Sequence, residues 1–88
     1  MSWSIQFTRS ARSQLEKLPE KVATAAVEFI YGPLCENPYR VGKPLRFELE
    51  GKYSARRGSY RVIYAVDQAK SCVRIHNIGH RADIYGRR

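Results

Sequence analysis

The sequence predicts one α+β domain, in which a helical hairpin covers one face of a twisted antiparallel β-meander and leaves a basic face open. Three observations carry this prediction. Two strand-like runs, residues 53–57 and 60–66, are separated only by Gly58 and Ser59. Two amphipathic runs come before them and join at Pro19. The 88 residues carry a formal net charge of +8, and a single domain over residues 1–88 is expected at this length.

The N-terminal part is interpreted as one strand followed by two helices. Apolar and polar residues alternate over residues 3–7, as in a half-buried strand. Thr8 is a candidate N-cap, and apolar residues at i, i+4 and i+7 from Ala11 give the next helix one buried face. Pro19 ends that helix and can take the first position of a second one. The Gly-Pro pair at residues 32–33 is expected to stop the second helix.

Residues 34–51 form a connector rich in turn residues. It is long for a small domain, so we expect it either to be functional or to be held on the core by Leu45 and Leu49. Lys43 and Arg46 make it basic.

The central hairpin has a register that its turn defines. A Gly-Ser pair between β-prone runs suits a two-residue type II′ turn with Gly58 at positive φ. Arg56 then faces Arg61, and Ser54 faces Ile63. Alternation places Ser54, Arg56 and Arg61 together on the open face. Two opposed arginines cost about 0.2–1 kcal/mol, so the pair either binds an anion or points into water.

A third strand is expected over residues 72–78, after a four-residue turn at 67–70. The helix-facing side is then apolar, and the open face of the hairpin carries no carboxylate. Residues 79–85 are expected to leave the sheet with Arg81 and Tyr85 within one helical turn. The expected neighbours across the last two strands are Tyr64 with Val73, Val62 with Ile75, His76 with Arg61, and Arg74 with Ile63.

The positive charge is confined to one half of the chain. Residues 1–39 hold four basic and four acidic side chains, whereas residues 40–88 hold twelve and four, and 12 − 4 gives the whole +8. This asymmetry is typical of a polyanion-binding surface. Cys35 and Cys72 fit no metal or disulfide pattern and indicate core thiols in a reducing cytosol. We expect a cytoplasmic protein without cofactor, metal or membrane partner.

Four segments in order carry a family resemblance. They are Gly42-Lys43-Pro44-Leu45, Leu49-Glu50-Gly51, the hairpin from Tyr53 to Tyr64, and His80-Arg81-Ala82-Asp83-Ile84-Tyr85. Together with the paired helices they resemble the RelE toxins of bacterial type II toxin–antitoxin modules, in the RelE/ParE superfamily. The similarity covers nearly the whole chain.

The resemblance implies a ribosome-dependent endoribonuclease that enters the A site of the 70S ribosome, cuts the mRNA codon and arrests translation and growth. It also implies a cognate antitoxin, with operator DNA bound only through the toxin–antitoxin complex. The family's active face has its matching positions here at Arg56, Arg61, Arg81 and Tyr85. Ser54 departs from the pattern, because the best-known member often has lysine there. The residues expected to hold RNA or the ribosome are Lys43, Arg46, Lys52, Ser54, Arg57 and Arg74.

A metal-independent cleavage would use the substrate's 2′-hydroxyl as nucleophile and give a 2′,3′-cyclic phosphate. Arginines suit stabilisation of the phosphorane charge and are poor bases, because they stay protonated. Tyr85 and His76 are the two alternatives for proton transfer.

Two other functions are compatible with the sequence. One is a ParE-like toxin that poisons DNA gyrase, although a pure binder needs no catalytic constellation. The other is a non-catalytic basic nucleic-acid-binding domain, which would bind free RNA.

Overall fold

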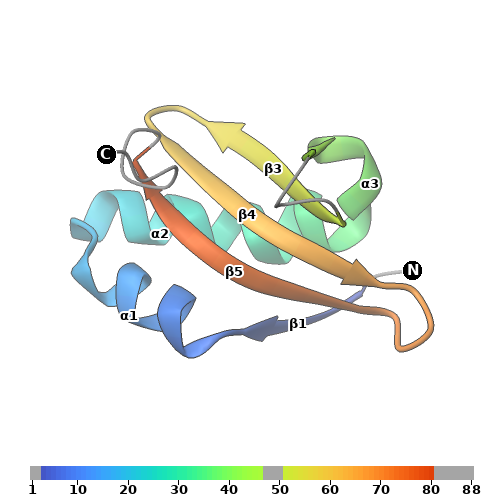
Figure 1. Cartoon of the computed structure of the whole chain (residues 1–88). Coiled ribbons are helices and arrows are strands. Elements are labelled where there is room, and N and C mark those ends of the chain that lie inside the picture. Colours follow the sequence, from blue (N-terminus) through green and yellow to red (C-terminus); the bar gives the residue numbers. More distant parts are fainter. Residues whose placement is uncertain (1–2, 47–50, 81–88) are drawn as a thin grey trace.

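A computed structural model of the chain describes residues 3–46 and 51–80. Helices α1 and α2 cover one face of a twisted sheet, as predicted (Figure 1). In chain order the elements are β1 (Ser4–Phe7), α1 (Arg9–Lys17), α2 (Glu20–Phe29), the π-helical turn η1 (Ile30–Leu34), α3 (Pro38–Val41), β2 (Lys43–Pro44), β3 (Lys52–Arg57), β4 (Tyr60–Asp67) and β5 (Cys72–His80).

The sheet has the strand order β1-β5-β4-β3-β2. The four strands from β2 to β5 pair antiparallel, which confirms the meander. Strand β1 lies parallel to β5 at the other edge, so the sheet as a whole is mixed. Backbone hydrogen bonds of 3.0 Å from Ser4 N to Ser71 O and from Thr8 N to Ile75 O hold both ends of β1.

The first helix begins as predicted, because Thr8 Oγ1 accepts a hydrogen bond of 3.0 Å from the Ala11 N–H. Pro19 occupies the N-cap of α2, one residue before the position expected. The acidic Glu20 therefore lies in the first turn, where it complements the helix dipole.

The helix stop predicted at residues 32–33 is wrong. Helix α2 runs directly into η1, which contains Pro33, and helical backbone continues to Glu36. The π turn widens the helix, so the proline ring avoids the carbonyl that it would meet in a regular α-helix. The chain leaves the helix only at Asn37, immediately before α3.

The core lies between the helices and the sheet, and Tyr64 is completely buried in it. Its hydroxyl donates a hydrogen bond of 2.6 Å to the Pro38 carbonyl oxygen, which ties α3 to β4. Burial raises the pKa of Tyr64, and nearby Tyr53 raises it further, so the phenol stays protonated. A Cβ at Gly42 would collide with this hydroxyl, so the chain between α3 and β2 requires glycine there.

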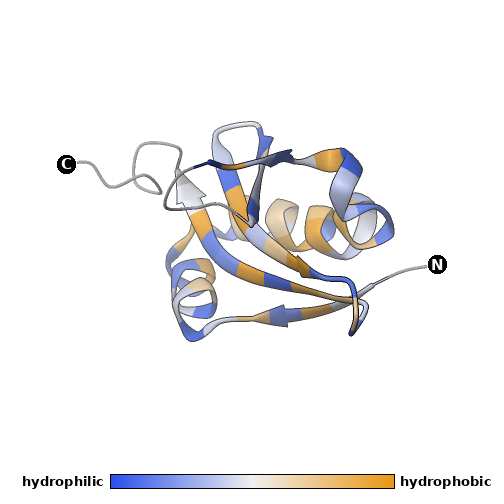
Figure 2. Ribbon diagram, turned by 45° about the vertical axis from the view of Figure 1, so that its right-hand side comes forward, coloured by the Kyte–Doolittle hydropathy of each residue, from blue (hydrophilic) through white to orange (hydrophobic). Residues whose placement is uncertain are grey.

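The predicted pairing of β4 with β5 is wrong. Each β4 residue pairs two positions further along β5 than predicted where its partner precedes a bulge at His76, and three positions further where its partner follows the bulge. The turn lies one residue later than expected, because Asp67 stays paired with Cys72 and Ser71 adopts a φ of 50°. Residues of β5 before the bulge keep their expected faces, whereas after it Ile78 points into the core and Asn77 lies on the open face. The alternation of polar and apolar residues is visible along the strands (Figure 2). The observed neighbours are Tyr64 with Ile75, Val62 with Ile78, Arg61 with Gly79, and Ile63 with Asn77. Strand β5 also continues to His80, so residues 79 and 80 belong to the sheet.

Candidate functional site: a basic pocket on the open face

The open face of the sheet is organised in rows, because directly opposed residues on neighbouring strands point to the same side. Arg56 lies opposite Arg61, as the hairpin turn predicted. The next row crosses four strands and consists of Lys43, Ser54, Ile63 and Asn77. The connector thus places a lysine beside the two arginines.

Lys43, Arg56 and Arg61 line one pocket of about 550 Å³, which we call the arginine pocket. Arg61 is half-buried, and its Nη1 donates a hydrogen bond of 3.4 Å to Ser54 Oγ. Among the described residues no carboxylate and no aromatic ring lines this pocket; its other lining residues are Val41, Pro44, Leu45 and Ser54. The lining residues that the structure describes therefore give the pocket positive charge.

The position of Lys43 depends on the core beneath it. The Tyr64–Pro38 hydrogen bond holds α3, and Gly42 lets the chain pass close over Tyr64. Strand β2 then pairs with β3 so that Lys43 lies directly opposite Ser54. This pairing could not be predicted from the sequence, because a two-residue strand carries no periodicity.

Several predicted site residues that the structure describes do not line this pocket: Arg46, Lys52, Arg57, Arg74 and His76. The Arg57 guanidinium lies over the ring of Phe29, 4.6 Å from its centroid, and this contact belongs to the helix side of the sheet. Arg46 is exposed beyond β2. Leu49, Arg81 and Tyr85 lie outside the described residues, so the predictions made for them stay predictions.

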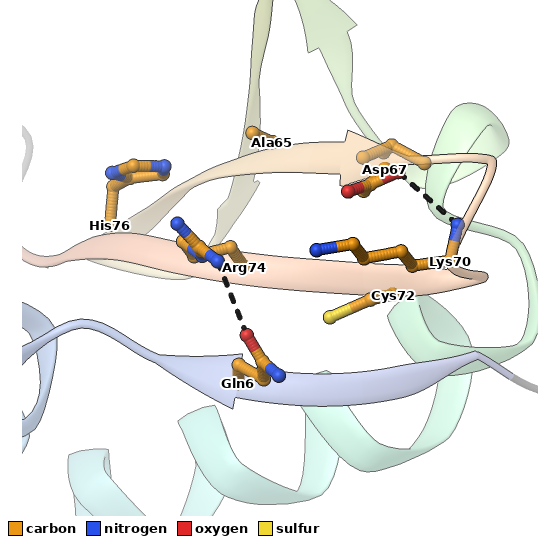
Figure 3. A pocket seen from close by; sticks show the side chains of 8 residues that line it. Gln6, Ala65, Asp67, Lys70, Cys72, Arg74 and His76 are labelled. Atoms are coloured by element: carbon orange, nitrogen blue, oxygen red, sulfur yellow. Dashed lines mark hydrogen bonds between the residues drawn. The ribbon is translucent and has the colours of Figure 1, made fainter.

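His76 does not lie beside Arg61, because the register of β5 and its bulge place it elsewhere. It lines a second hollow on the open face (Figure 3). Burial lowers the pKa of His76, and the positive charges of Lys52 and Arg74 lower it further. His76 is therefore neutral at pH 7 and can accept a proton, but it does so away from the arginine pocket.

The expectation that no carboxylate lies on the open face of the hairpin is also wrong. Asp67 ends β4 and lines the same second hollow as His76. Its Oδ1 accepts a hydrogen bond of 3.2 Å from the Lys70 N–H, which closes the turn. The carboxylate is thus six residues along β4 from Arg61, at the other end of the face.

Cys35 and Cys72 are both buried and free, as predicted for core thiols. Within residues 3–46 and 51–80, no three His, Cys, Asp or Glu side chains gather as a metal site would require. Across the same residues no helix has the length and apolarity to cross a membrane.

These features define a small α+β protein with helices on one face of its sheet and a pocket lined by basic side chains on the other. Residues 5–85 match the family model described as ParE toxin of type II toxin-antitoxin system, parDE. Toxin RelG of Mycobacterium tuberculosis is 51% identical over 87 residues, covering 99% of this chain and all 100% of that one. Toxin RelE of the same organism is 51% identical over 83 residues, covering 94% of this chain and 86% of that one.

The structure also resembles the crystal structure of the toxin–antitoxin complex RelBE2 from Mycobacterium tuberculosis. The TM-score is 0.89 and the sequence identity 47%, over 92% of this chain and 100% of that one. The chain belongs to the RelE/ParE family and is a RelE-type toxin of a type II toxin–antitoxin system.

Proposed function

We propose that this toxin is a ribosome-dependent endoribonuclease that cleaves mRNA codons in the A site and is neutralised by a cognate antitoxin. The observation that carries the proposal is the gathering of Lys43, Arg56 and Arg61 around one pocket. Three cations directed at one space suit the negative charge that builds on a phosphate during cleavage. The similarity to toxins named RelE and RelG supports ribonuclease activity.

The proposed reaction begins with attack of the substrate's 2′-oxygen on the adjacent phosphorus. The bond from phosphorus to the 5′-oxygen then breaks, leaving a 2′,3′-cyclic phosphate and a 5′-hydroxyl end. Arg56 and Arg61 would stabilise the phosphorane, and both keep their protons at every physiological pH. Lys43 would supply a third positive charge from the position opposite Ser54.

Proton transfer is assigned by the family resemblance to Tyr85, with Arg81 as a further cation. His76 is the alternative, because its lowered pKa keeps the imidazole neutral and able to accept a proton. His76 lies in a different hollow from Arg56 and Arg61, so Tyr85 is favoured over His76 as the group that transfers the proton.

The arginine pocket also supports dependence on the ribosome. Proteins that hold single-stranded RNA by themselves stack its bases on aromatic side chains. No aromatic residue is among those that line this pocket in the described part of the chain. The pocket can neutralise a phosphate but offers no surface to orient a base, so the ribosome would present the codon in a geometry fit for attack.

Binding of an antitoxin is proposed from the similar RelBE2 toxin–antitoxin complex. Operator DNA would be bound only through such a complex. Co-expression of this toxin with a small gene adjacent to its own should restore growth, and the purified complex should melt at a higher temperature than the toxin alone.

Poisoning of DNA gyrase is the competing function, because the matching family model is described as a ParE toxin. The two functions can be distinguished in cells after expression of the toxin is induced. Primer extension should show cuts within translated codons while chromosomal DNA stays intact. DNA breaks together with intact mRNA would replace the ribonuclease proposal with the gyrase one.

A further inference from the structure

A second hollow of about 240 Å³ lies on the open face and shares no lining residue with the arginine pocket. Figure 3 shows Arg74 and His76 on β5, and Lys70 extending from the turn back along the strand toward Arg74. We call this second hollow the Arg74 hollow. Its lining residues are Gln6, Ala65, Val66, Asp67, Lys70, Cys72, Arg74 and His76.

The hollow exists because a small residue sits in the middle of a row of long ones. Gln6 pairs with Arg74, Arg74 with Ala65, and Ala65 with Lys52, so one row crosses four strands. Ala65 has a single side-chain carbon between two long cationic side chains. It forms a low floor, and the longer side chains form the walls.

The walls are suited to an anion. Arg74 and Lys70 are both exposed and positively charged. Arg74 Nη2 donates a hydrogen bond of 3.4 Å to Gln6 Oε1, which orients the guanidinium across β1 and β5. Asp67 is the one acidic lining residue, and one of its oxygens is already used by the Lys70 N–H.

Size narrows the choice of anion. Pockets for drug-sized ligands span roughly 300–1,000 Å³. At about 240 Å³ the Arg74 hollow is smaller, which suits a phosphate with part of its sugar rather than a whole nucleotide. Arg61 and Ala65 are four residues apart on β4, so the two basic sites are separated by about 13 Å along the strand.

We propose that the Arg74 hollow is a second phosphate-binding site, which holds a phosphodiester of the RNA backbone while another RNA phosphate occupies the arginine pocket. The inference rests on the proposed function, because it takes RNA as the substrate. Arg74 supplies a planar fork for two phosphate oxygens, and Lys70 adds a mobile point charge.

The test measures affinity with RNA that cannot be cut. The probe is a ribosome carrying a message whose A-site codon has 2′-O-methyl riboses, which removes the attacking hydroxyl. Lys70→Ala combined with Arg74→Ala should weaken binding roughly tenfold. It should also make the plot of log affinity against log salt shallower by about 0.7, the loss of one single-strand phosphate contact.

Two further variants make the test specific. Arg12→Ala combined with Lys17→Ala removes the same charge from exposed positions of α1 and should leave affinity and salt dependence unchanged. Asp67→Asn keeps an acceptor for the Lys70 N–H but removes the negative charge, so it should tighten binding. Melting temperatures close to that of the unmodified protein would show that all three variants fold.

The source of the phosphodiester follows from the length of the message. If the loss caused by the Lys70/Arg74 variant disappears on a message that ends at the A-site codon, the hollow holds the messenger strand. If the loss persists, it holds ribosomal RNA. Either result supports the proposal.

The proposal is overturned if the Lys70/Arg74 variant binds like the unmodified protein, or if the α1 control loses as much affinity. Failure of the proposed function is distinguishable, because it would appear as an unmodified message left intact by the unmodified toxin.

Discussion

Lys43 and Ser54 lie directly opposite each other on β2 and β3, so the connector supplies a positive charge beside a serine of the hairpin. The same pocket contains Arg56 and Arg61. We therefore propose that Lys43 belongs to the pocket in which cleavage takes place, whereas the sequence predicted only a contact with RNA or the ribosome.

Lys43→Ala should therefore slow single-turnover cleavage on saturated ribosomes by roughly tenfold to a hundredfold, somewhat less than the usual loss for a preorganised donor because Lys43 is exposed. Lys17→Ala, on the exposed side of α1, is the control. If the Lys43 variant cleaves as fast as the unmodified toxin, Lys43 contributes to binding and not to the reaction.

Arg61 is held by its hydrogen bond to Ser54 and lies opposite Arg56. Arg61→Ala should lower the single-turnover rate by about 10²–10³, the range for loss of one transition-state donor. Arg61→Lys should recover only part of it, since an ammonium cannot contact two phosphate oxygens as a planar fork does. An Arg61→Lys variant that cleaves as fast as the unmodified toxin would show that the fork geometry plays no part.

The buried Tyr64–Pro38 hydrogen bond should affect both stability and activity. Tyr64→Phe leaves the Pro38 carbonyl without this donor, so the free energy of unfolding should fall by about 1–3 kcal/mol. Release of α3 should also lower the cleavage rate through Lys43. Urea unfolding measures the first effect, and single-turnover cleavage at a temperature where the variant is folded measures the second. Full activity in the folded variant would show that Lys43 does not depend on this bond.

Gly42→Ala offers an independent check on the same region. Its Cβ would collide with the Tyr64 hydroxyl, so the expected loss of stability is about 1–3 kcal/mol, as for other overpacked sites. Glycine at residue 32 has open space around it and serves as the control, where alanine should cause no such clash. Equal stability for the two alanine variants would show that the chain between α3 and β2 can move away from Tyr64.

His76 should make stability depend on pH. Its folded-state pKa is lowered from 6.5, so the unfolded chain binds the proton more readily than the folded one. Stability should be fully present above the unfolded pKa of 6.5 and should decrease as the pH falls below it toward the folded pKa. Urea midpoints at about pH 7.5 and pH 5.5 measure the change, and His76→Asn should reduce it. An unchanged difference in the variant would assign the effect to other groups.

Local chemistry explains which parts of this structure could be predicted from the sequence. The register of β3 with β4 was predicted correctly because only Gly58 and Ser59 lie between the two strands, so a two-residue turn must join them. The start of α1 was correct because Thr8 has a capping oxygen. In both cases the deciding residues are adjacent in the chain.

The errors arose where distant residues decide the structure. The bulge at His76 and the positive φ of Ser71 shifted β5 along β4. A histidine does not by itself indicate a bulge, and a serine does not indicate a positive φ. Pro33 was taken for a helix stop, but a π turn accommodates it. The pairing of β2 with β3 depends on the buried Tyr64 and on a glycine, both remote from Ser54 in sequence.

We propose that the arginine pocket cleaves RNA on the ribosome by attack of the 2′-hydroxyl. The most direct test of this proposal is single-turnover cleavage of an end-labelled message with the purified toxin, in the presence and absence of ribosomes, followed by analysis of the new ends. We expect cleavage within the A-site codon only when ribosomes are present, a 2′,3′-cyclic phosphate on the upstream fragment, and near-complete loss of cleavage in the Arg56→Ala/Arg61→Ala variant. Equal cleavage of free RNA, a linear 3′-hydroxyl end, or an active double variant would contradict it.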